Sequence, residues 1–332
     1  MTITRRHCMP IVLFALLVAQ LAGLPLVPDA AAQAYPTKVI KLIAPYPPGG
    51  GVDTVARLLA ERLSARLGQQ VVVDNKPGAG ATIGGEALAK SAPDGYTLML
   101  GSIIDYSTAP LFQKNLAFDM RRDFAPIVEV GFGTVGLIVS ADLPVKSMQE
   151  LIALAKAKPG TLSFASSGTG GLHHLNMEMF KQAAGVDLVH VPYKGTTQFM
   201  PDLVAGRVQI TMDSMPAHLP QIKAGKTRAL AVASKQRSPM LPDVPTMAEA
   251  GLVGFESATN YTLFAPAGTP REVIALLNKE VNEVLKQQDL RERLLALGII
   301  VSGGSTESIQ ARIPLEMAKW ANVVKTANIK ID

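Results

Sequence analysis

The sequence predicts an α/β fold of two domains joined by a hinge, with a cleft between the domains. From residue 39 onward, short apolar strands alternate with amphipathic helices, a pattern typical of a parallel sheet covered by helices on both faces. Glycine-rich turns open a helix in both halves of the chain, which indicates an anion held between two domains. We expect residues 35–131 and 257–332 to form a discontinuous domain 1 and residues 132–256 to form domain 2.

The elements of the first half follow from hydrophobic periodicity. A near-continuous apolar strand at 39–44 leads into a helix whose apolar stripe ends at Gly68. Two further strands, at 71–73 and 97–100, flank a helix near 85–90. This first unit is an α/β unit with one glycine-rich turn.

The second half is an α/β domain by itself. Ser147 and Glu150 form a capping box that starts a helix ending at Pro159. Strands are expected at 126–130, 135–140, 162–165, 188–191, 209–213 and 229–233, and further helices at 171–184 and 198–205.

The last stretch has few strands of its own and is expected to pack back on the first unit. A strand at 260–265 precedes a helix for which Thr269 is the expected N-cap and Pro270 the first helical residue. A final helix is expected at 307–324. The chain therefore crosses between the domains twice, near Gly131 and near Glu256.

The N-terminus has the features of a secretory signal peptide. Arg5 and Arg6 precede an apolar stretch at 11–24, and small residues at 30–34 offer a cleavage site. We expect residues 1–34 to be removed and the mature protein to be periplasmic. Cys8, the only cysteine, lies before the apolar stretch, so we expect no lipid anchor and no disulfide. The formal net charge of +5 is too mild for a nucleic-acid-binding protein.

The first glycine-rich turn supplies the candidate ligand residues Tyr46, Pro48, Gly49, Gly50 and Gly51. The first amides of a helix have no acceptor within the helix, and the helix dipole adds partial positive charge at this end. Glycine lets a ligand approach those amides closely, and the tyrosine ring can cover its apolar body. The alternative is an ordinary strand-to-helix turn.

The second glycine-rich turn adds hydroxyl donors to the exposed amides. Its candidate residues are Ser166, Ser167, Gly168, Thr169, Gly170 and, in the following helix, His174. The glycine segments contain no lysine or arginine, which favours a carboxylate over a polyphosphate. The alternative is a helix N-cap made of serines.

A third turn repeats this arrangement with Tyr193, Gly195 and Thr196, and Asp213 lies at the end of a strand, where α/β folds place ligand residues. Capping of the next turn is an equal alternative for Asp213. We expect no metal site, because the adjacent His173 and His174 point about 100° apart on a helix. We also expect no cofactor.

A hydrolase is the alternative function. Ser166, His174 and Asp213 can be drawn as a catalytic triad of an exported serine hydrolase, but the sequence has no Gly-x-Ser-x-Gly motif. Residue types alone do not establish a triad.

The order of the motifs resembles the substrate receptors of tripartite tricarboxylate transporters, the Bug-type periplasmic binding proteins. The resemblance covers essentially the whole mature chain, and it rests on eight motifs in the same order: Tyr35-Pro36-Thr37-Lys38, Pro47-Pro48-Gly49-Gly50-Gly51, the stretch Val73 to Gly80, Asp94-Gly95-Tyr96-Thr97-Leu98, Asp123-Phe124-Ala125-Pro126-Ile127, Ser166 to Leu175, His190 to Gly195, and Leu241 to Thr246.

The resemblance implies a two-domain Venus-flytrap receptor with no catalytic activity and no cofactor. It implies that the β-to-α turns of both domains, 46–51, 166–170 and 193–196, hold a small organic carboxylate, and that Asp213 is a cleft aspartate. The expected partners are the membrane permease subunits, although a sensor kinase stays open. We expect a monomer.

One loop departs from the family pattern. After Gly101-Ser102 the family commonly has Thr-His and then Asn-Pro, whereas this chain has Asp105-Tyr106 and Ala109-Pro110. We expect Ser102 and Asp105 to face the far end of the ligand, where an aspartate would repel a second carboxylate. Our hypothesis is a ligand with one carboxylate and a distal polar, cationic or aromatic group.

Overall fold

The computed structural model describes residues 35–113 and 115–326. The expected signal peptide, residues 1–34, lies outside the described residues. Residues 35–37 fall in a separate unit, whereas the chain from Lys38 onward forms one compact unit. No helix in the described part of the chain has both the length and the apolar character needed to span a membrane.

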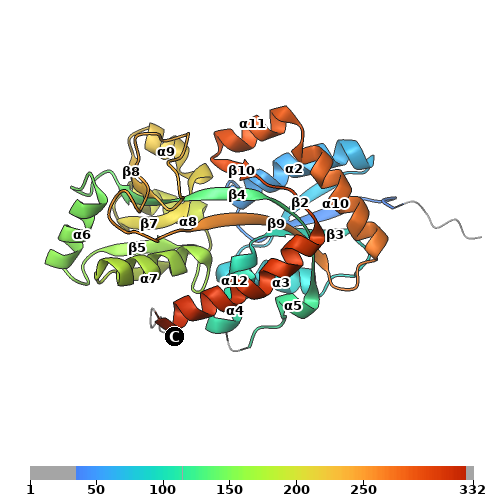
Figure 1. Ribbon diagram of the computed structural model, residues 1–332, viewed down its shortest axis with the longest axis horizontal. Helices are drawn as coiled ribbons and strands as arrows, with labels where there is room; N and C mark the ends of the chain where they lie inside the picture. Colours follow the sequence, from blue (N-terminus) through green and yellow to red (C-terminus); the bar gives the residue numbers. More distant parts are fainter. Residues whose placement is uncertain (1–34, 114, 327–332) are drawn as a thin grey trace, which may run out of the picture. The chain divides into compact units, whose positions relative to one another are not determined.

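The described strands form two groups that share β4, and we call the two parts of the molecule built on these groups lobe 1 and lobe 2. Lobe 1 is built on six strands (Figure 1). Three of them are parallel, with β1 (Ile40–Ala44) between β2 (Val71–Asn75) and β3 (Thr97–Gly101). Next to β3 lies β9 (Ala258–Pro266), which is antiparallel both to β3 and to β4 (Phe124–Ser140). The short β10 (Ile299–Val301) pairs with β4 as well.

Lobe 2 is built on the second part of β4 together with four other strands. From Val135 onward, β4 pairs in antiparallel fashion with β7 (Ile210–Ser214) and β8 (Thr227–Val232). Next to β7 lies β5 (Ser163–Ser166), followed by β6 (Val189–Pro192), and both pairings are parallel. One strand therefore runs through both lobes.

The expected parallel sheet is wrong in its centre, because the crossing strands β4 and β9 are antiparallel to their neighbours. The two strands expected at 126–130 and 135–140 are one strand of 17 residues. Gly131 and Gly133 lie between the two expected strands, and in the structure each is paired with β9 on one side and with β10 on the other.

The helices expected from the sequence are present, and four more, at 103–112, 120–123, 219–223 and 288–296, were not assigned from it. Lobe 1 carries α2 (Gly51–Leu67), α3 (Thr82–Ala89), α4 (Ile103–Phe112), α5 (Met120–Asp123), α10 (Arg271–Leu285), α11 (Gln288–Ala296) and α12 (Thr306–Thr326). Lobe 2 carries α6 (Met148–Ala157), α7 (Leu172–Ala184), α8 (Thr196–Val204) and α9 (Leu219–Lys223). The N-cap of α10 is Pro270 rather than Thr269, whose hydroxyl donates to the carbonyl of Pro266 at 2.7 Å.

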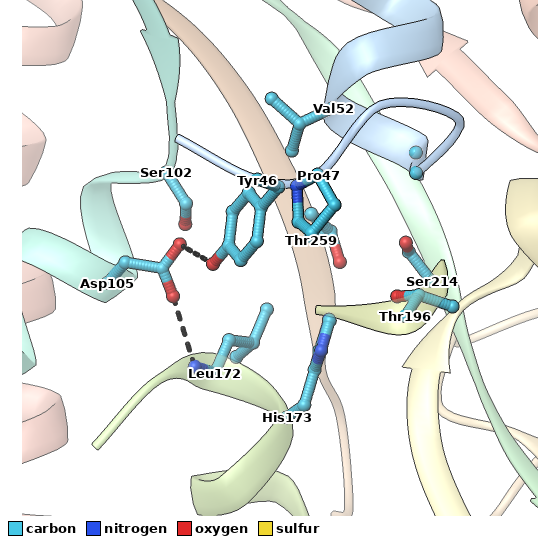
Figure 2. Close-up of a pocket in the computed structure, with 12 residues that line it drawn as sticks. Tyr46, Pro47, Val52, Ser102, Asp105, Leu172, His173, Thr196, Ser214 and Thr259 are labelled. Atoms are coloured by element: carbon cyan, nitrogen blue, oxygen red, sulfur yellow. Dashed lines mark hydrogen bonds between the residues drawn. The ribbon is translucent and has the colours of Figure 1, made fainter. Parts of the chain in front are cut away.

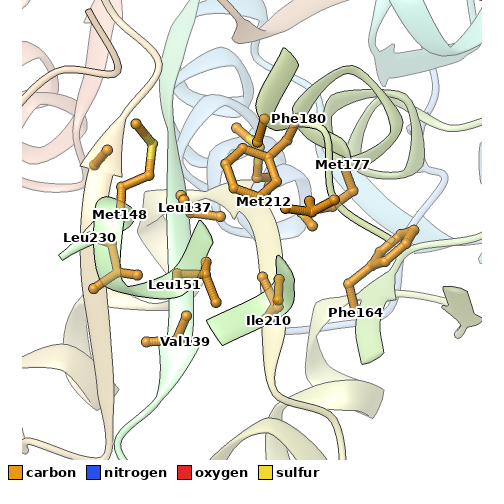
Figure 3. Packing of buried hydrophobic residues seen from close by; sticks show 14 of the residues in the cluster. Leu137, Val139, Met148, Leu151, Phe164, Met177, Phe180, Ile210, Met212 and Leu230 are labelled. Atoms are coloured by element: carbon orange, nitrogen blue, oxygen red, sulfur yellow. The ribbon is translucent and has the colours of Figure 1, made fainter. Parts of the chain in front are cut away.

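Each lobe has its own apolar core. In lobe 2, Leu137 and Val139 of β4 pack with Phe164, Phe180 and other apolar side chains (Figure 3). A separate cluster in lobe 1 contains Tyr106 among several phenylalanines. A third cluster joins side chains of α4 and α12 to side chains of α7, so apolar packing also holds the two lobes together.

Candidate functional site

A small cavity lies where four helices begin. The helices α2, α4, α7 and α8 follow β1, β3, β5 and β6, so their N-terminal turns gather at the carboxyl ends of these strands. The cavity, of about 20 Å³, is lined by Tyr46, Pro47, Gly50, Gly51, Val52, Ser102, Asp105 and Thr259 from lobe 1 and by Leu172, His173, Thr196 and Ser214 from lobe 2 (Figure 2). Within the described part of the chain, this lining contains no lysine or arginine. Any anion bound here would depend on neutral donors, on His173 and on helix dipoles.

The first turn divides into a part that faces the cavity and a part that does not. Gly50 and Gly51 line the cavity, but Pro48 and Gly49 are exposed and lie outside the lining. The amide of Gly49 donates to Asp53 Oδ2 at 2.9 Å, so it is already used within the turn. The first-turn amides of α2 are therefore the donors that this turn offers to the cavity.

The second turn is held by its own side chains. Ser166 is buried, and its hydroxyl lies 2.7 Å from His190 Nε2. Ser167 Oγ lies 2.9 Å from His173 Nδ1. Thr169 is exposed, and none of the residues 166–170 lines the cavity. These side chains shape the turn, and the residues after it, Leu172 and His173, reach the cavity.

His174 is a structural residue of this turn. Its Nδ1 accepts the amide proton of Gly170 at 3.1 Å, and its ring stacks on His190 with 4.0 Å between centroids. Burial, with the nearby His190 and Lys181, lowers the pKa of His174 to about 3. The ring is therefore neutral and packed inside lobe 2.

Asp213 lies behind the cavity wall, and its contacts hold residues of the wall in place. Its carboxylate lies 2.8 Å from His173 Nε2 and 2.9 Å from His218 Nε2, and it accepts from the Thr196 hydroxyl at 2.6 Å. Burial opposes ionisation, but the two histidines outweigh it and hold the pKa of Asp213 well below its usual range. Burial also opposes the charge of His173, yet Asp213 raises the pKa of that imidazole. Asp213 is a positioning residue for Thr196 and His173, and it does not line the cavity itself.

In the third turn, Tyr193 points away from the cavity, because its hydroxyl donates to Asp202 Oδ2 at 2.6 Å. Gly195, the N-cap of α8, packs against Pro47 of lobe 1. Only Thr196 of this turn lines the cavity.

The loop that departs from the family pattern lies in the cavity wall. Ser102 caps α4, accepting from the amide of Ile104 at 3.1 Å and donating to Asn260 Oδ1 at 2.6 Å. Asp105 accepts from the Tyr46 hydroxyl at 2.7 Å and from the amide of Leu172 at 3.1 Å (Figure 2). The second bond joins a side chain of lobe 1 to the helix α7 of lobe 2.

The two lobes touch directly around the cavity. Gly168 of lobe 2 has a φ of +123°, and a Cβ atom there would lie 2.7 Å from the amide nitrogen of Gly80 in lobe 1. The Thr108 hydroxyl of α4 is shared between the carbonyl of Ile104 in its own helix, at 2.8 Å, and the carbonyl of Gly170 in lobe 2, at 3.0 Å. The structure is therefore a closed form.

The sequence pattern of the family described as "Tripartite tricarboxylate transporter family receptor" matches residues 55–329. The chain belongs to this family. BugT of Bordetella pertussis is 38% identical over 305 residues, 90% of this chain and 92% of that protein. A protein of Pseudomonas sp. strain P51 encoded in the tcbD-tcbE intergenic region is 40% identical over 295 residues, 88% of this chain and 87% of that protein.

Solved structures of this receptor family superpose closely. The R. palustris protein Rpa4515 with adipate has a TM-score of 0.86 at 38% identity, covering 89% of this chain and 98% of that one. MatC from Rhodopseudomonas palustris with bound malate has a TM-score of 0.83 at 32% identity, covering 87% of this chain and 100% of that one. The periplasmic binding protein BugD has a TM-score of 0.85 at 37% identity, covering 89% and 99%. The fold is the two-domain fold of periplasmic binding proteins, and the protein is a solute-binding receptor rather than an enzyme.

The hydrolase alternative fails on geometry as well. Ser166 contacts His190 rather than His174, and Asp213 contacts His173 and His218. His174 accepts an amide proton and is held as a neutral ring. The three residues drawn as a triad therefore do not form one.

Five residues of the cavity lining were not predicted from the sequence. They are Val52, Leu172, His173, Ser214 and Thr259. Three of them are direct neighbours of predicted residues and Leu172 lies two positions away, so widening each motif by one or two positions would have found these four. His173 was considered only as a metal ligand, and Thr259 lies on the crossing strand β9, where no local motif marks it.

Proposed function

We propose that this protein captures a small carboxylate between its two lobes in the periplasm and delivers it to the permease of a tripartite tricarboxylate-type transporter. The observation that carries the proposal is the convergence of helix N-termini from both lobes on one cavity without lysine or arginine in the described lining. Relatives with adipate and with malate support the ligand class. We also propose that residues 1–34 are removed and that the mature protein is a monomer. In this proposal, domain 1 comprises residues 35–131 and 257–332, and domain 2 comprises residues 132–256.

The size of the cavity requires that the lobes open. Its volume of about 20 Å³ suits a single water molecule, whereas pockets for small molecules usually measure roughly 300 Å³ or more. A solute enters when the lobes separate, and closure onto the solute, in a form with a wider cavity than this one, then brings the amides of both lobes to it. Binding therefore favours a closed form over an open one.

One buried hydroxyl in the cavity wall is available to a solute. Among the described residues, Thr259 Oγ1 is buried without a hydrogen-bond partner. Leaving a buried hydroxyl unpaired costs about 1–3 kcal/mol, and a bond to a charged solute would recover it. Ser257 makes a matched control, because its buried hydroxyl also has no partner in the described part of the chain but lines a different groove, beside Trp320.

The first experiment is a thermal-shift screen of residues 35–332, refolded from denaturant to remove carried ligand, against mono-, di- and tricarboxylates. A solute at about 100 times its Kd adds roughly 2.7 kcal/mol of stability. For the best solute we expect Thr259→Val to weaken binding by about tenfold or more without lowering the melting temperature, and Ser257→Ala to leave Kd unchanged. A screen in which no carboxylate stabilises the refolded protein would contradict the proposed ligand class.

A further inference from the structure

A carboxylate of the protein itself already occupies an anion position in the cleft. Asp105 lies in the first turn of α4 in lobe 1, with only 2% of its surface exposed. Its Oδ1 accepts from the amide of Leu172, the first helical residue of α7 in lobe 2. The N-terminus of a helix favours negative charge. Burial raises the pKa of Asp105, whereas the hydrogen bonds from Tyr46 and Leu172 favour its charged form. When ionised, Asp105 takes the place at α7 that a carboxylate of a solute would otherwise occupy.

Tyr46 fixes the second oxygen of this carboxylate. The hydroxyl of Tyr46 donates to Asp105 Oδ2 at 2.7 Å (Figure 2). Burial, with the adjacent Asp105, raises the pKa of Tyr46 well above its usual value, so the phenol keeps its proton and stays a donor. Each oxygen of Asp105 thus has a donor and still has a free lone pair, because a carboxylate oxygen can accept more than one hydrogen bond.

The charges around the cleft disfavour the binding of a solute with two negative charges. Two buried aspartates, Asp105 and Asp213, both interact electrostatically with His173, and the described lining offers no lysine or arginine. A second carboxylate on the solute would lie next to Asp105, and the one described lining residue that can carry a positive charge, His173, is already paired with Asp213 at 2.8 Å. Like charges roughly 5 Å apart at an effective dielectric constant of about 20 disfavour binding by about 250-fold.

We infer that Asp105 restricts the cleft to solutes with a single carboxylate whose far end carries an ammonium group or another hydrogen-bond donor. The inference rests on the proposed function. The carboxylate of the solute would use the first-turn amides of α2 and the hydroxyl of Thr259, which Asp105 leaves available. The donor at the far end would share the free lone pairs of Asp105.

The test compares solutes of equal length that differ at one end. Isothermal titration at pH 8 would use dicarboxylates of four to eight carbons, the ω-amino acids of the same length and the plain monocarboxylates. An aromatic set of terephthalate, 4-(aminomethyl)benzoate and 4-methylbenzoate is added. We expect the wild-type protein to bind the amino-terminated member of a set at least tenfold more tightly than the dicarboxylate.

Variants assign this preference to the aspartate. Asp105→Asn should reverse the order, strengthening dicarboxylate binding by about tenfold or more. Tyr46→Phe, which keeps the charge and removes one donor, should preserve the order. Glu86→Gln removes an exposed carboxylate on α3 that pairs with Lys90, and it should change nothing. If Asp105→Asn does not fold, the wild-type order alone still tests the inference.

The outcomes separate the two proposals. Tighter binding of dicarboxylates by the wild-type protein, or an unchanged order in a folded Asp105→Asn, would overturn the role of Asp105 and leave the carboxylate receptor intact. Failure of every carboxylate to bind either protein would overturn the proposed function itself.

Discussion

Gly195→Ala offers a direct test of the closed form, because it adds one methyl group at the contact between the lobes. Gly195 is the N-cap of α8 in lobe 2, and a Cβ atom there would lie 2.4 Å from Pro47 Cδ in lobe 1. The backbone at Gly195 is extended, so alanine adds no strain of its own. The overlap is confined to the closed form and disappears when the lobes separate.

The size of the effect follows from the overlap. Forcing a methyl group into a packed contact costs about 1–3 kcal/mol, and here the cost falls on the closed form alone. A penalty of this size lowers the apparent affinity by about 5-fold to 150-fold, because the apparent Kd is the intrinsic Kd divided by the competent fraction. Isothermal titration with the best solute measures the Kd, and small-angle X-ray scattering follows the opening of the lobes.

Gly85→Ala is the matched control. A Cβ atom at Gly85 would lie 2.7 Å from Phe118 Cζ, a comparable overlap inside the core of lobe 1. This change should lower the free energy of unfolding by a similar amount and leave the Kd unchanged. If Gly195→Ala binds the solute within twofold of the wild type and scatters identically, the contact between Gly195 and Pro47 does not belong to the bound form, and the reasoning fails.

Three further predictions concern single side chains. The pKa of His174, about 3, lies below that of an unfolded histidine, so at acid pH the unfolded chain takes up a proton that the folded protein does not. The free energy of unfolding therefore falls as the pH drops from about 6.5 toward 3, by at most about 5 kcal/mol. Urea unfolding at pH 7 and 4.5 should show that His174→Gln loses less stability at the lower pH than the wild type, and an equal loss would contradict the assignment. Ser166→Ala should lower the free energy of unfolding by about 1 kcal/mol through the lost contact with His190. Neither the wild-type protein nor this variant should hydrolyse p-nitrophenyl acetate, and wild-type turnover that the variant abolishes would support the hydrolase alternative. Thr108→Val removes the hydrogen bond to Gly170 across the lobes and should weaken solute binding by up to about tenfold, whereas an unchanged Kd would show that this bond does not support closure.

Local patterns in the sequence identified the elements that meet at the site. Each glycine-rich turn follows a strand and opens a helix, and the structure brings the residues Gly51, Thr196 and Leu172, at or just after these turns, to one cavity. Asp105 stood out as a departure from the family pattern, and the structure places it in the cavity wall.

The contacts of individual side chains could not be predicted, because they depend on how the helices are rotated and packed. His173 and His174 are neighbours on one helix, and only the packing of His174 on His190 decides that His173 faces the cavity. The local sequence predicts that the amide of Gly49 is available to a ligand, but in the structure this amide donates to the side chain of Asp53. The placement of β9 between β3 and β4 is a pairing of distant segments, and no periodicity within either segment encodes it.

The position of β9 also governs the order in which the chain can assemble. Residues 135–232 hold the described strands of lobe 2 in one continuous segment, so none of their pairings joins residues further apart in the sequence than Gly136 and Val232. Lobe 1 needs β9 and β10, which arrive only after residue 257. During synthesis one edge of β3 therefore has no partner strand until most of the chain has been made, and we expect the closing of this long loop to be slow. A chain shortened before β9 would keep the segments of lobe 2 but could not complete lobe 1.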